Sequence, residues 1–389
     1  MGLLSTLIGI FSSRLAKCID PPTLPKDENP LRIGILGAAA IAPQALILPA
    51  RSHPGVVVQA VAARDEARAR LFAATHGIPQ VFANYQQMLD SPDIDAIYNP
   101  LPNGLHFEWT MKALKAGKHV LLEKPSSNSS EETRQMFALA DQKNLVLLEA
   151  FHYRFHPANQ RFRELVTSGT LGKLQSIEVR MALLSGFFSK DDIRFNYDLG
   201  GGATTDMGCY TMSFARWLAG SEPTVELAKP DLFPERPQVD RAMTADLIFR
   251  PSSQPTTPVH AKIYCDLAQP WKWGIIPNLP ELTVKATCER GTITIDGFVI
   301  PTIRHSITIA EMNQPKRSET CHQFVGDGAI GEEWWTTYRY QLEAFVDKVR
   351  GREPQFWISG EDSVAQTKAL EAVYVKSGLQ PRPTSTYKP

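Results

Sequence analysis

The sequence contains no long hydrophobic run. Its first apolar stretch, residues 3–11, spans about nine positions, whereas a helix that crosses a membrane needs about twenty. The basic residues Arg14 and Lys17 follow this stretch, whereas a secretory signal carries its basic residues ahead of the apolar part. We therefore expect no membrane span and no secretory signal. The stretch favours a short helix packed on the fold; a transit peptide is the alternative, because no acid precedes Asp20.

Cysteine and histidine are scarce. The five cysteines are scattered without a CxxC pair, and the nine histidines lack the spacing of metal ligands. This pattern argues against a disulfide framework and against a structural zinc site. It suits a reducing compartment, so we expect a cytoplasmic location and no metal.

Neither sign of charge is in excess. Lys and Arg number 41, and Asp and Glu also number 41. The chain therefore has no overall field that would attract nucleic acid or an anionic membrane, and any anion must bind at a local site. What is present is the composition of an ordinary globular enzyme, 43% hydrophobic and 21% charged, and the length of 389 residues favours two domains.

The first half alternates strands and helices. Short apolar runs predict strands over residues 31–36, 56–62, 96–98, 119–122 and 145–149. Helical segments are expected between them, over residues 41–50, 66–75, 107–116 and 131–142. This order predicts parallel βαβ units, and so a doubly wound Rossmann domain over residues 31–150 after an extension and proline-rich linker over residues 1–30. Ligands of such sheets bind at the carboxyl ends of the strands.

After residue 150 the predicted strands follow one another with few helices between them. They cover residues 175–181, 242–249, 260–266, 282–288 and 292–295, and amphipathic helices over residues 335–350 and 362–377 close the chain. This order predicts an α+β substrate domain over residues 151–383, with a large, open, mostly antiparallel sheet that carries helices on one face.

A run of small residues follows the first predicted strand. Its members are Gly37, Ala38, Ala39, Ala40 and Ile41. Small residues at this turn let a diphosphate approach the helix N-terminus, where unpaired N–H groups and the helix dipole favour anions. The run departs from G-x-G-x-x-G, and simple packing is the alternative explanation. Its place at the first βα turn favours a dinucleotide site.

The end of the second predicted strand carries no acid. A site for NAD normally has an acid there that holds the ribose 2′-hydroxyl. Ala63 occupies this position, Arg64 follows it, and Arg68 lies one helical turn further on. Two guanidinium groups suit one phosphate dianion, so the segment favours NADP. A solvated helix start, with Asp65 and Glu66 paired to these arginines, is the alternative.

Two further segments carry groups suited to chemistry. Glu123, Lys124 and Pro125 end an apolar strand, which directs a cation into the cofactor cleft, and the Lys124–Pro125 peptide bond could be cis. Further along, a glycine-rich turn at residues 199–202 opens a helix on which Asp206 and Tyr210 share one face.

Tyrosine has an ordinary pKa near 10 and is a poor base at neutral pH. A neighbouring ammonium lowers that pKa, so we expect Lys124 to lie close to Tyr210 and make it a proton acceptor for a sugar hydroxyl. A core tyrosine beside a helix cap is the alternative.

Taken in order, these segments resemble the Gfo/Idh/MocA oxidoreductases, the family of glucose–fructose oxidoreductase and inositol dehydrogenase. Residues 60–65 and 149–157 look most like the NADP-dependent D-xylose and dihydrodiol dehydrogenases of that family, and residues 332–360 are similar to its closing helix. The resemblance covers roughly residues 31–383. It implies NADP as the cofactor, a carbohydrate or cyclic polyol as the substrate, and a homodimer or higher homo-oligomer that pairs through the open sheet.

The resemblance also implies residue roles. Lys124 and Tyr210 would carry proton transfer, and Asp206 would bind a substrate hydroxyl. Arg64 and Arg68 would take the 2′-phosphate. Further cofactor neighbours would be Leu101, Pro102, Asn103, His106, Glu123 and Arg194, and further substrate contacts would be Tyr153 and Arg154. His152 and His156 are interpreted as packing residues at the domain junction.

Two other functions remain open from the sequence. One is a tightly held NADP that exchanges hydride between two sugars or assists glycoside cleavage. The other is a non-catalytic regulator that senses NADP. The presence of Lys124, Asp206 and Tyr210 together favours an enzyme.

Overall fold

The computed structural model describes residues 13–389 except positions 190, 255, 272, 274, 277 and 327. The helix expected over residues 3–11 lies outside the described residues. Residues 13–19 are helical, and the proline-rich linker that follows has no regular structure. Arg14 donates to the carbonyl of Thr302, and Lys26 donates to the carbonyls of Ala50 and His53 at 2.6 and 2.9 Å. This N-terminal segment therefore contacts both halves of the molecule.

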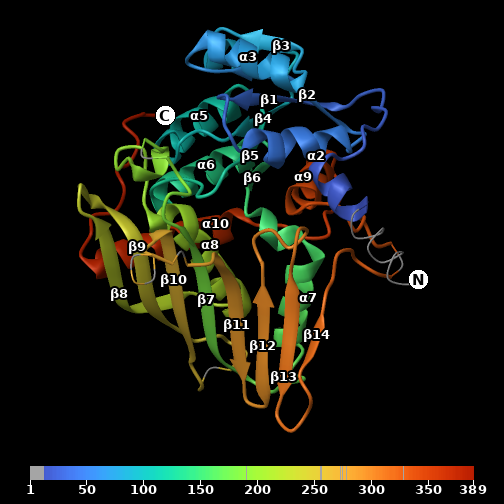
Figure 1. Cartoon of the computed structure of the whole chain (residues 1–389). Coiled ribbons are helices and arrows are strands. Elements are labelled where there is room, and N and C mark those ends of the chain that lie inside the picture. Colours follow the sequence, from blue (N-terminus) through green and yellow to red (C-terminus); the bar gives the residue numbers. More distant parts are fainter. Residues whose placement is uncertain are drawn as a thin grey trace.

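Six parallel strands form the first sheet, in the order β3-β2-β1-β4-β5-β6 (Figure 1). Their bounds are β1 Leu31–Leu36, β2 Val56–Ala62, β3 Gln80–Phe82, β4 Ala96–Asn99, β5 His119–Leu122 and β6 Leu147–Glu149. The inner strands are almost wholly buried, which explains why their residues form apolar runs rather than an alternating pattern. The strand order reverses between β1 and β4, and the carboxyl ends of these strands border the crevice where such sheets bind ligands.

Helices cover both faces of this sheet. They are the π-helix η1 Pro43–Ile47, α2 Leu48–Arg51, α3 Glu66–His76, α4 Tyr85–Asp90, α5 Asn103–Lys115 and α6 Ser130–Gln142. Buried residues of α4, α5 and α6 share one apolar cluster with the sheet. On the other side, α9 Thr337–Val349 returns from the far end of the chain and packs on η1 and α2.

Eight strands form the second sheet, in the order β14-β13-β12-β11-β7-β10-β9-β8. Their bounds are β7 Leu174–Leu184, β8 Pro223–Phe233, β9 Arg236–Phe249, β10 Val259–Gln269, β11 Glu281–Cys288, β12 Gly291–Asp296, β13 Ser306–Glu311 and β14 Arg317–Glu319. Only the β7–β10 pair is parallel among the strand pairs of this sheet that the structure describes.

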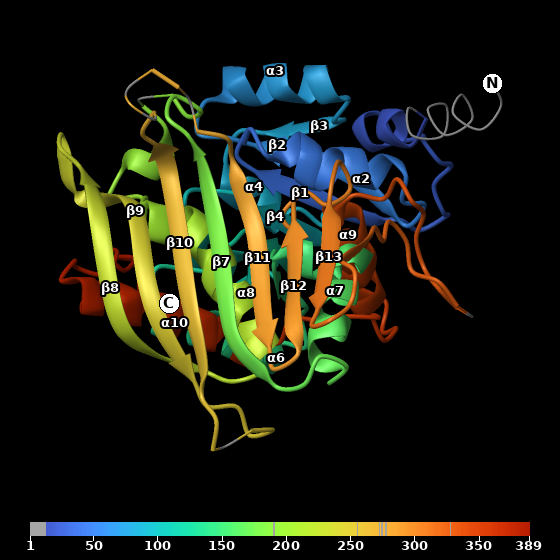
Figure 2. The same cartoon turned by 60° about the horizontal axis from the view of Figure 1, so that its bottom comes forward.

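One face of the second sheet is covered by α7 Pro157–Thr167, α8 Cys209–Ala219 and α10 Gly360–Ser377, whereas the other face is open (Figure 2). Burial alternates along the central strand β7, with Ile177 and Val179 buried and Glu178 and Arg180 partly exposed, as expected for a sheet packed on one side. The predicted fold class is confirmed.

Some elements differ from the prediction. The helix expected over residues 41–50 is a π-helix followed by a short α-helix. Strands β3, β8, β13 and β14 and helices α4 and α7 were not predicted. β8 is an edge strand that contains Pro223 and Pro230, which a central strand would not tolerate.

Residues 379–389 form a C-terminal strap that runs from α10 across to α5 (Figure 1). In the second domain, Arg382 donates from Nε to the Gly201 carbonyl at 2.5 Å, and its guanidinium pairs with the buried carboxylate of Asp240. In the first domain, the Asn128 side chain donates to the carbonyl of Pro383 at 2.8 Å. The strap therefore fastens to both domains beside the glycine-rich turn.

Candidate active site

The turn after β1 presents backbone amides to the crevice. Gly37 adopts a φ of +85°, which favours glycine, and a Cβ atom there would lie 3.2 Å from Leu101 Cδ2. Its amide donates to the Ala62 carbonyl at 2.6 Å. The next four amides, from Ala38 to Ile41, donate no hydrogen bond to any residue that the structure describes. A cluster of unpaired N–H groups without bulky side chains fits a diphosphate.

The two arginines after β2 lie beside this turn. Asp65 caps α3 by accepting from the Arg68 backbone N–H at 3.1 Å, and the Arg68 guanidinium donates to the Ala38 carbonyl at 3.2 Å. Glu66 pairs with Arg70 on the same helix. Across the described part of the chain, neither Arg64 nor Arg68 pairs with an acid, so the arrangement is not the paired helix start considered as the alternative.

Lys124, Asp206 and Arg194 form one buried ion network at the carboxyl end of β5. The Lys124 ammonium donates to Asp206 Oδ1 at 3.0 Å and to the Asp206 carbonyl at 2.8 Å. Arg194 Nε donates to the other carboxylate oxygen at 2.8 Å and also pairs with Asp192 at 3.0 Å. Burial alone would raise the pKa of Asp206, but the charges of Arg194 and Lys124 outweigh it and hold that pKa well below its usual range. The network therefore keeps a carboxylate and two cations charged within the cavity.

Local helix geometry places Asp206. The glycine-rich turn leads into the π-helix η4 Thr204–Gly208, which continues into α8. Asp206 and Tyr210 both line the same cavity as Lys124, although the π-helix changes their spacing from that of a regular α-helix. The structure therefore brings the three proposed catalytic residues together, and the Lys124–Pro125 bond is cis as the sequence permitted.

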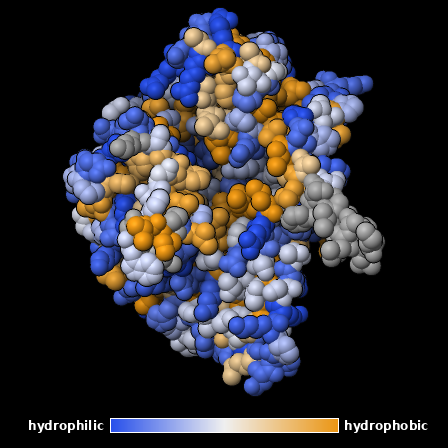
Figure 3. Space-filling view, in the orientation of Figure 1, coloured by the Kyte–Doolittle hydropathy of each residue, from blue (hydrophilic) through white to orange (hydrophobic). Residues whose placement is uncertain are grey.

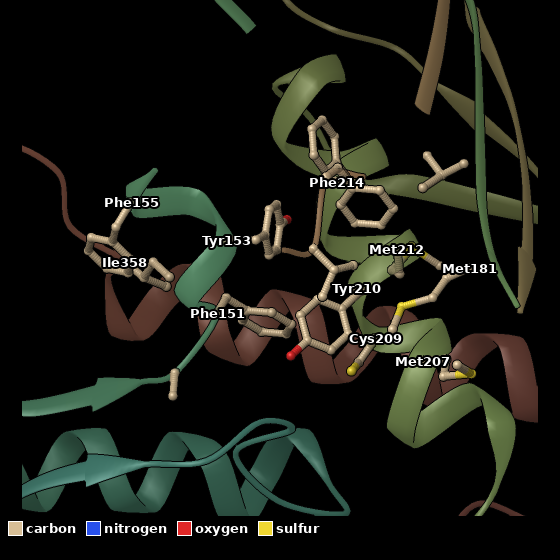
Figure 4. Packing of buried hydrophobic residues seen from close by; sticks show 14 of the residues in the cluster. Phe151, Tyr153, Phe155, Met181, Met207, Cys209, Tyr210, Met212, Phe214 and Ile358 are labelled. Atoms are coloured by element: carbon tan, nitrogen blue, oxygen red, sulfur yellow. The ribbon is translucent and has the colours of Figure 1, made fainter. Parts of the chain in front are cut away.

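Tyr210 is not activated in the way that the sequence suggested. The Lys124 ammonium lies 4.8 Å from the centroid of the Tyr210 ring and is bonded to Asp206 rather than to the tyrosine hydroxyl. Burial, with Glu123 nearby, raises the pKa of Tyr210 well above its ordinary value. Figure 4 shows its ring beside Phe151, with the hydroxyl pointing away from Phe214 and Met212. The expectation of a lowered pKa for Tyr210 is wrong.

His152 contacts the tyrosine hydroxyl. Its Nε2 lies 2.9 Å from the Tyr210 hydroxyl and its Nδ1 lies 2.7 Å from Thr337 Oγ1. The ring also stacks on Tyr338, with 4.0 Å between the centroids. His152 is thus a buried residue whose hydrogen bonds join Tyr210 to Thr337. His156, in contrast, caps α7 by accepting from the Ala158 N–H at 3.1 Å, as a structural role requires.

Thr337 and Tyr338 were missed from the sequence. They stand at the start of α9, far along the chain from the motifs, and no local pattern marks them. The packing of α9 on η2 brings them beside His152.

The loop residues around β4 and β5 have distinct positions. Leu101, Asn103, His106 and Glu123 line the cavity, whereas Pro102 is the residue before α5. His106 is buried and its two ring nitrogens lie 2.8 and 2.7 Å from the carbonyls of Pro125 and Leu101, so it ties these two loops together. Glu123 accepts from the Tyr98 hydroxyl at 2.7 Å, and burial raises its pKa.

Two proposed substrate contacts lie elsewhere. Tyr153 is fully buried, and its hydroxyl donates to Ser213 at 2.9 Å within the core of the second domain. Arg154 pairs with Asp362 and lies over the Trp217 ring. In the short η2 helix His152–Phe155, only His152 hydrogen-bonds to Tyr210, while the centroid of the Tyr153 ring lies 5.8 Å from that of the Tyr210 ring. Neither Tyr153 nor Arg154 lines the cavity.

The cavity between the domains has a volume of about 270 Å³. Its polar side carries the ion network and Tyr210. Its apolar lining includes Met181, Leu183, Phe187, Phe188 and Ile193, and the Arg194 guanidinium lies over the Phe188 ring. Figure 3 shows a hollow between the two domains with hydrophobic side chains along its border. This mixed lining suits a compact ligand that carries both hydroxyl groups and C–H groups.

Within the described residues, no group of three or more His, Cys, Asp or Glu could hold a metal ion, and all five cysteines are free thiols. Among the helices that the structure describes, none combines the length and the hydrophobicity that a membrane span requires.

This fold and site define a two-domain oxidoreductase of the dinucleotide-binding class, and comparisons with known proteins identify the family. The profile described as the oxidoreductase family with an NAD-binding Rossmann fold, GFO_IDH_MocA, matches residues 31–151. The profile for the GFO/IDH/MocA C-terminal domain matches residues 159–294. The chain belongs to the GFO/IDH/MocA oxidoreductase family, and the resemblance noted from its motifs is confirmed.

Individual relatives agree with this assignment. The NADP(+)-dependent D-xylose 1-dehydrogenase 2 of Haloferax volcanii is 33% identical over 350 residues, 88% of this chain and 96% of the relative. The trans-1,2-dihydrobenzene-1,2-diol dehydrogenase of Xenopus laevis is 34% identical over 175 residues, 45% of this chain and 51% of the relative. The solved structure of a mutant of KijD10, a 3-ketoreductase of Actinomadura kijaniata in complex with TDP-benzene and NADP, covers 93% of this chain and 100% of its own, with 25% identity and a TM-score of 0.75.

Proposed function

We propose that the chain is an NADP-dependent dehydrogenase that oxidises a hydroxyl group of a sugar or a cyclic polyol. The observation that carries the proposal is the convergence of Lys124, Asp206 and Tyr210 on one cavity at the carboxyl end of β5. The names of the relatives support the cofactor and the substrate class, since they include an NADP(+)-dependent D-xylose dehydrogenase and a dihydrodiol dehydrogenase.

The residues present fit NADP. The unpaired amides of residues 38–41 would hold the diphosphate, and the guanidinium groups of Arg64 and Arg68, which pair with no acid of the described residues, would hold the 2′-phosphate. Bound NADP supplies a ring that accepts a hydride. We propose Leu101, Pro102, Asn103, His106, Glu123 and Arg194 as the residues that shape the nicotinamide side of the cleft.

The chain's own residues would orient the substrate and move its proton. The Lys124 ammonium, held by Asp206, would stabilise negative charge on the substrate oxygen. Asp206 and Arg194 would bind neighbouring hydroxyls, and Tyr210 would accept the hydroxyl proton. The apolar wall would contact the C–H face of the ring and exclude water from the cleft.

An absorbance screen at the reduced-nicotinamide band tests the proposal. NADP and NAD would each be combined with pentoses, hexoses, cyclitols and aromatic diols, and we expect NADP reduction with at least one group. If the protein is purified without added nucleotide, already carries NADP and turns over without added NADP, the alternative of a tightly bound cofactor is favoured. Tight NADP binding without oxidation of any compound would instead favour the regulator.

Substitution of the proposed catalytic lysine tests the site. Lys124→Ala should bind NADP normally but lose turnover by about 10²-fold or more, because a donor to the developing charge is removed. Lys112→Ala is the matched control, since Lys112 pairs with Glu108 on the surface of α5. Unchanged turnover in Lys124→Ala would contradict the assignment.

We also propose that the chain pairs through the open face of the eight-stranded sheet. This face carries partly exposed Arg180, Tyr264 and Glu281, and Arg180 contacts the other two from the strand between them. Light scattering during gel filtration should give the mass of a dimer or a larger assembly, and a monomer mass at micromolar concentration would contradict the pairing.

A further inference from the structure

We propose that Tyr210, His152 and Thr337 form a proton relay that carries the proton of the substrate hydroxyl away from the cleft to a second cavity beside α9. The inference rests on the proposed dehydrogenase function, and it assigns positioning and relay roles to two residues that the motifs did not mark. It makes His152 and Thr337 part of the machinery that allows Tyr210 to accept a proton.

A continuous chain of hydrogen bonds joins the three side chains. The Tyr210 hydroxyl lies 2.9 Å from His152 Nε2, and His152 Nδ1 lies 2.7 Å from Thr337 Oγ1. Tyr210 is 5% exposed, His152 is 1% exposed and Thr337 is 2% exposed, so bulk water is excluded from the hydrogen bonds between them. A proton can pass between such groups without solvent only through these contacts.

Tyr210 is not ionised at neutral pH and so cannot act as a base by itself. Burial raises its pKa well above the ordinary value, and the nearby Lys124 ammonium is bonded to Asp206. Its hydroxyl therefore keeps its own proton at neutral pH and can accept another only if it gives the first one up. In the described chain, the hydrogen bond of this hydroxyl goes to His152, which is the group that can take that proton.

The imidazole suits a concerted transfer. Burial, together with the charge of Lys124, lowers the pKa of His152 to about 3, so the ring is neutral. A neutral imidazole carries one donor and one acceptor nitrogen, and it can accept from one hydroxyl while it donates to the other in either tautomer. The ring can therefore gain a proton at Nε2 as it loses one at Nδ1, with no buried charge left behind.

The stacked Tyr338 holds the ring and separates two cavities. It lines the substrate cavity and also a second cavity of about 230 Å³, which Thr337 lines as well. Exposed side chains, including Lys17, Gln44 and Ile303, border the second cavity, so it opens to solvent. The proton would thus leave on the side opposite to the substrate.

The proposed transfer conserves protons and electrons. The substrate carbon loses a hydride, with its electron pair, to the nicotinamide ring, and the C–O bond becomes a carbonyl. The substrate O–H proton moves to the Tyr210 oxygen as the tyrosine proton moves to His152 Nε2. The Nδ1 proton passes to Thr337, and the threonine proton passes to water in the second cavity. Each relay group ends with the number of protons that it had at the start.

The test compares hydride-transfer rates of wild type, Thr337→Val and Thr337→Ser in single turnovers with NADP and an oxidisable polyol. Valine keeps the shape of threonine but removes the hydroxyl. We expect Thr337→Val to lower the rate at pH 7 by about 10²-fold, the lower end of what a proton-transfer group contributes, and Thr337→Ser to recover most of it. Ser52→Ala is the control, because Ser52 also lines the second cavity but takes no part in the hydrogen bonds that join Tyr210, His152 and Thr337.

Two readouts separate a relay from a merely structural role. In mixtures of H₂O and D₂O, the wild-type rate should depend on several protons in flight, and the Thr337→Val rate on fewer. The wild-type rate should vary little between pH 7 and 9, whereas the Thr337→Val rate should rise with pH, since the tyrosine must then ionise. The other titratable groups near Tyr210 are Lys124, Glu123, Asp206, Cys209, Tyr98, Tyr153 and Tyr338.

His152→Gln gives an independent test if Thr337→Val folds poorly, which NADP binding and thermal melting would report. Glutamine can hydrogen-bond to both hydroxyls but relays protons poorly, so it should reproduce the steep pH dependence. If both variants show the same solvent isotope dependence and the same pH dependence as the wild type, the relay is wrong, while the proposed function still stands. Wild-type protein that oxidises no polyol would instead contradict the proposed function, and the relay with it.

Discussion

The preference for NADP gives a prediction whose size follows from the positions of two side chains. Arg64 and Arg68 are exposed, and the Arg68 guanidinium already lies over the turn at Ala38. A hydrogen bond to a charged group contributes about 1.5–3 kcal/mol, and exposed pairs fall at the low end. Two such contacts at about 1.5 kcal/mol each give about 3 kcal/mol, which corresponds to about 10²-fold in Kd.

The double variant Arg64→Ala/Arg68→Ala should therefore bind NADP about 10²-fold more weakly, while NAD binding changes little. Titration calorimetry with each nucleotide, at low and at moderate salt, measures both values. Arg70→Ala is the matched control, because Arg70 lies on the same helix but pairs with Glu66. An equal loss for NAD and NADP, or a change in NADP affinity of less than threefold, would refute the assignment of these arginines to the 2′-phosphate.

Two further predictions concern stability. Burial raises the pKa of Glu149 from 4.5 to about 7, so its contribution to stability is fully present below pH 4.5 and is lost as the pH rises through about 7. At about 1.4 kcal/mol per pKa unit, this loss is worth roughly 3.5 kcal/mol, and Glu149→Gln should remove it. If the melting temperatures of variant and wild type change with pH in the same way between pH 5 and 8, the prediction is contradicted. Arg382→Ala leaves the buried Asp240 without its cation and should cost about 3–5 kcal/mol in denaturant unfolding, whereas a loss below 1 kcal/mol would show that the ion pair contributes little.

Most of the first domain could be predicted from the sequence. Buried parallel strands produce continuous apolar runs, and β1, β2 and β5 begin and end at the predicted residues. The second sheet was predicted from its central strands, whose residues alternate between a covered and an open face. Its edge strand β8 was missed because an edge strand tolerates proline and exposed polar residues, and a sequence of that composition is typical of a loop.

The site was predicted in its outline but not in its chemistry. Lys124, Asp206 and Tyr210 converge as expected, because each follows a strand end or a glycine turn. The environment of Tyr210 could not be predicted, since its burial depends on residues from several distant segments. Thr337 and Tyr338 reach the site through the packing of α9 on η2, η1 and α2, which no local pattern encodes.

The side chains of neighbouring residues on the short η2 helix also point in different directions, which the sequence spacing does not reveal. His152 hydrogen-bonds to the Tyr210 hydroxyl, whereas the Tyr153 hydroxyl donates to Ser213 in the core and Arg154 pairs with Asp362. A motif identifies such a segment, but the direction of each side chain depends on the 3₁₀ turn that the segment adopts.

The C-terminal strap limits how the two domains can move. Its residues bind Gly201 and Asp240 on one side of the cleft and Asn128 on the other, and Tyr387 packs edge-on against Phe107 of α5. A hinge rotation that opened the crevice would have to break these contacts. Exchange of a dinucleotide should therefore depend on movement of the surface loops rather than on swinging of whole domains.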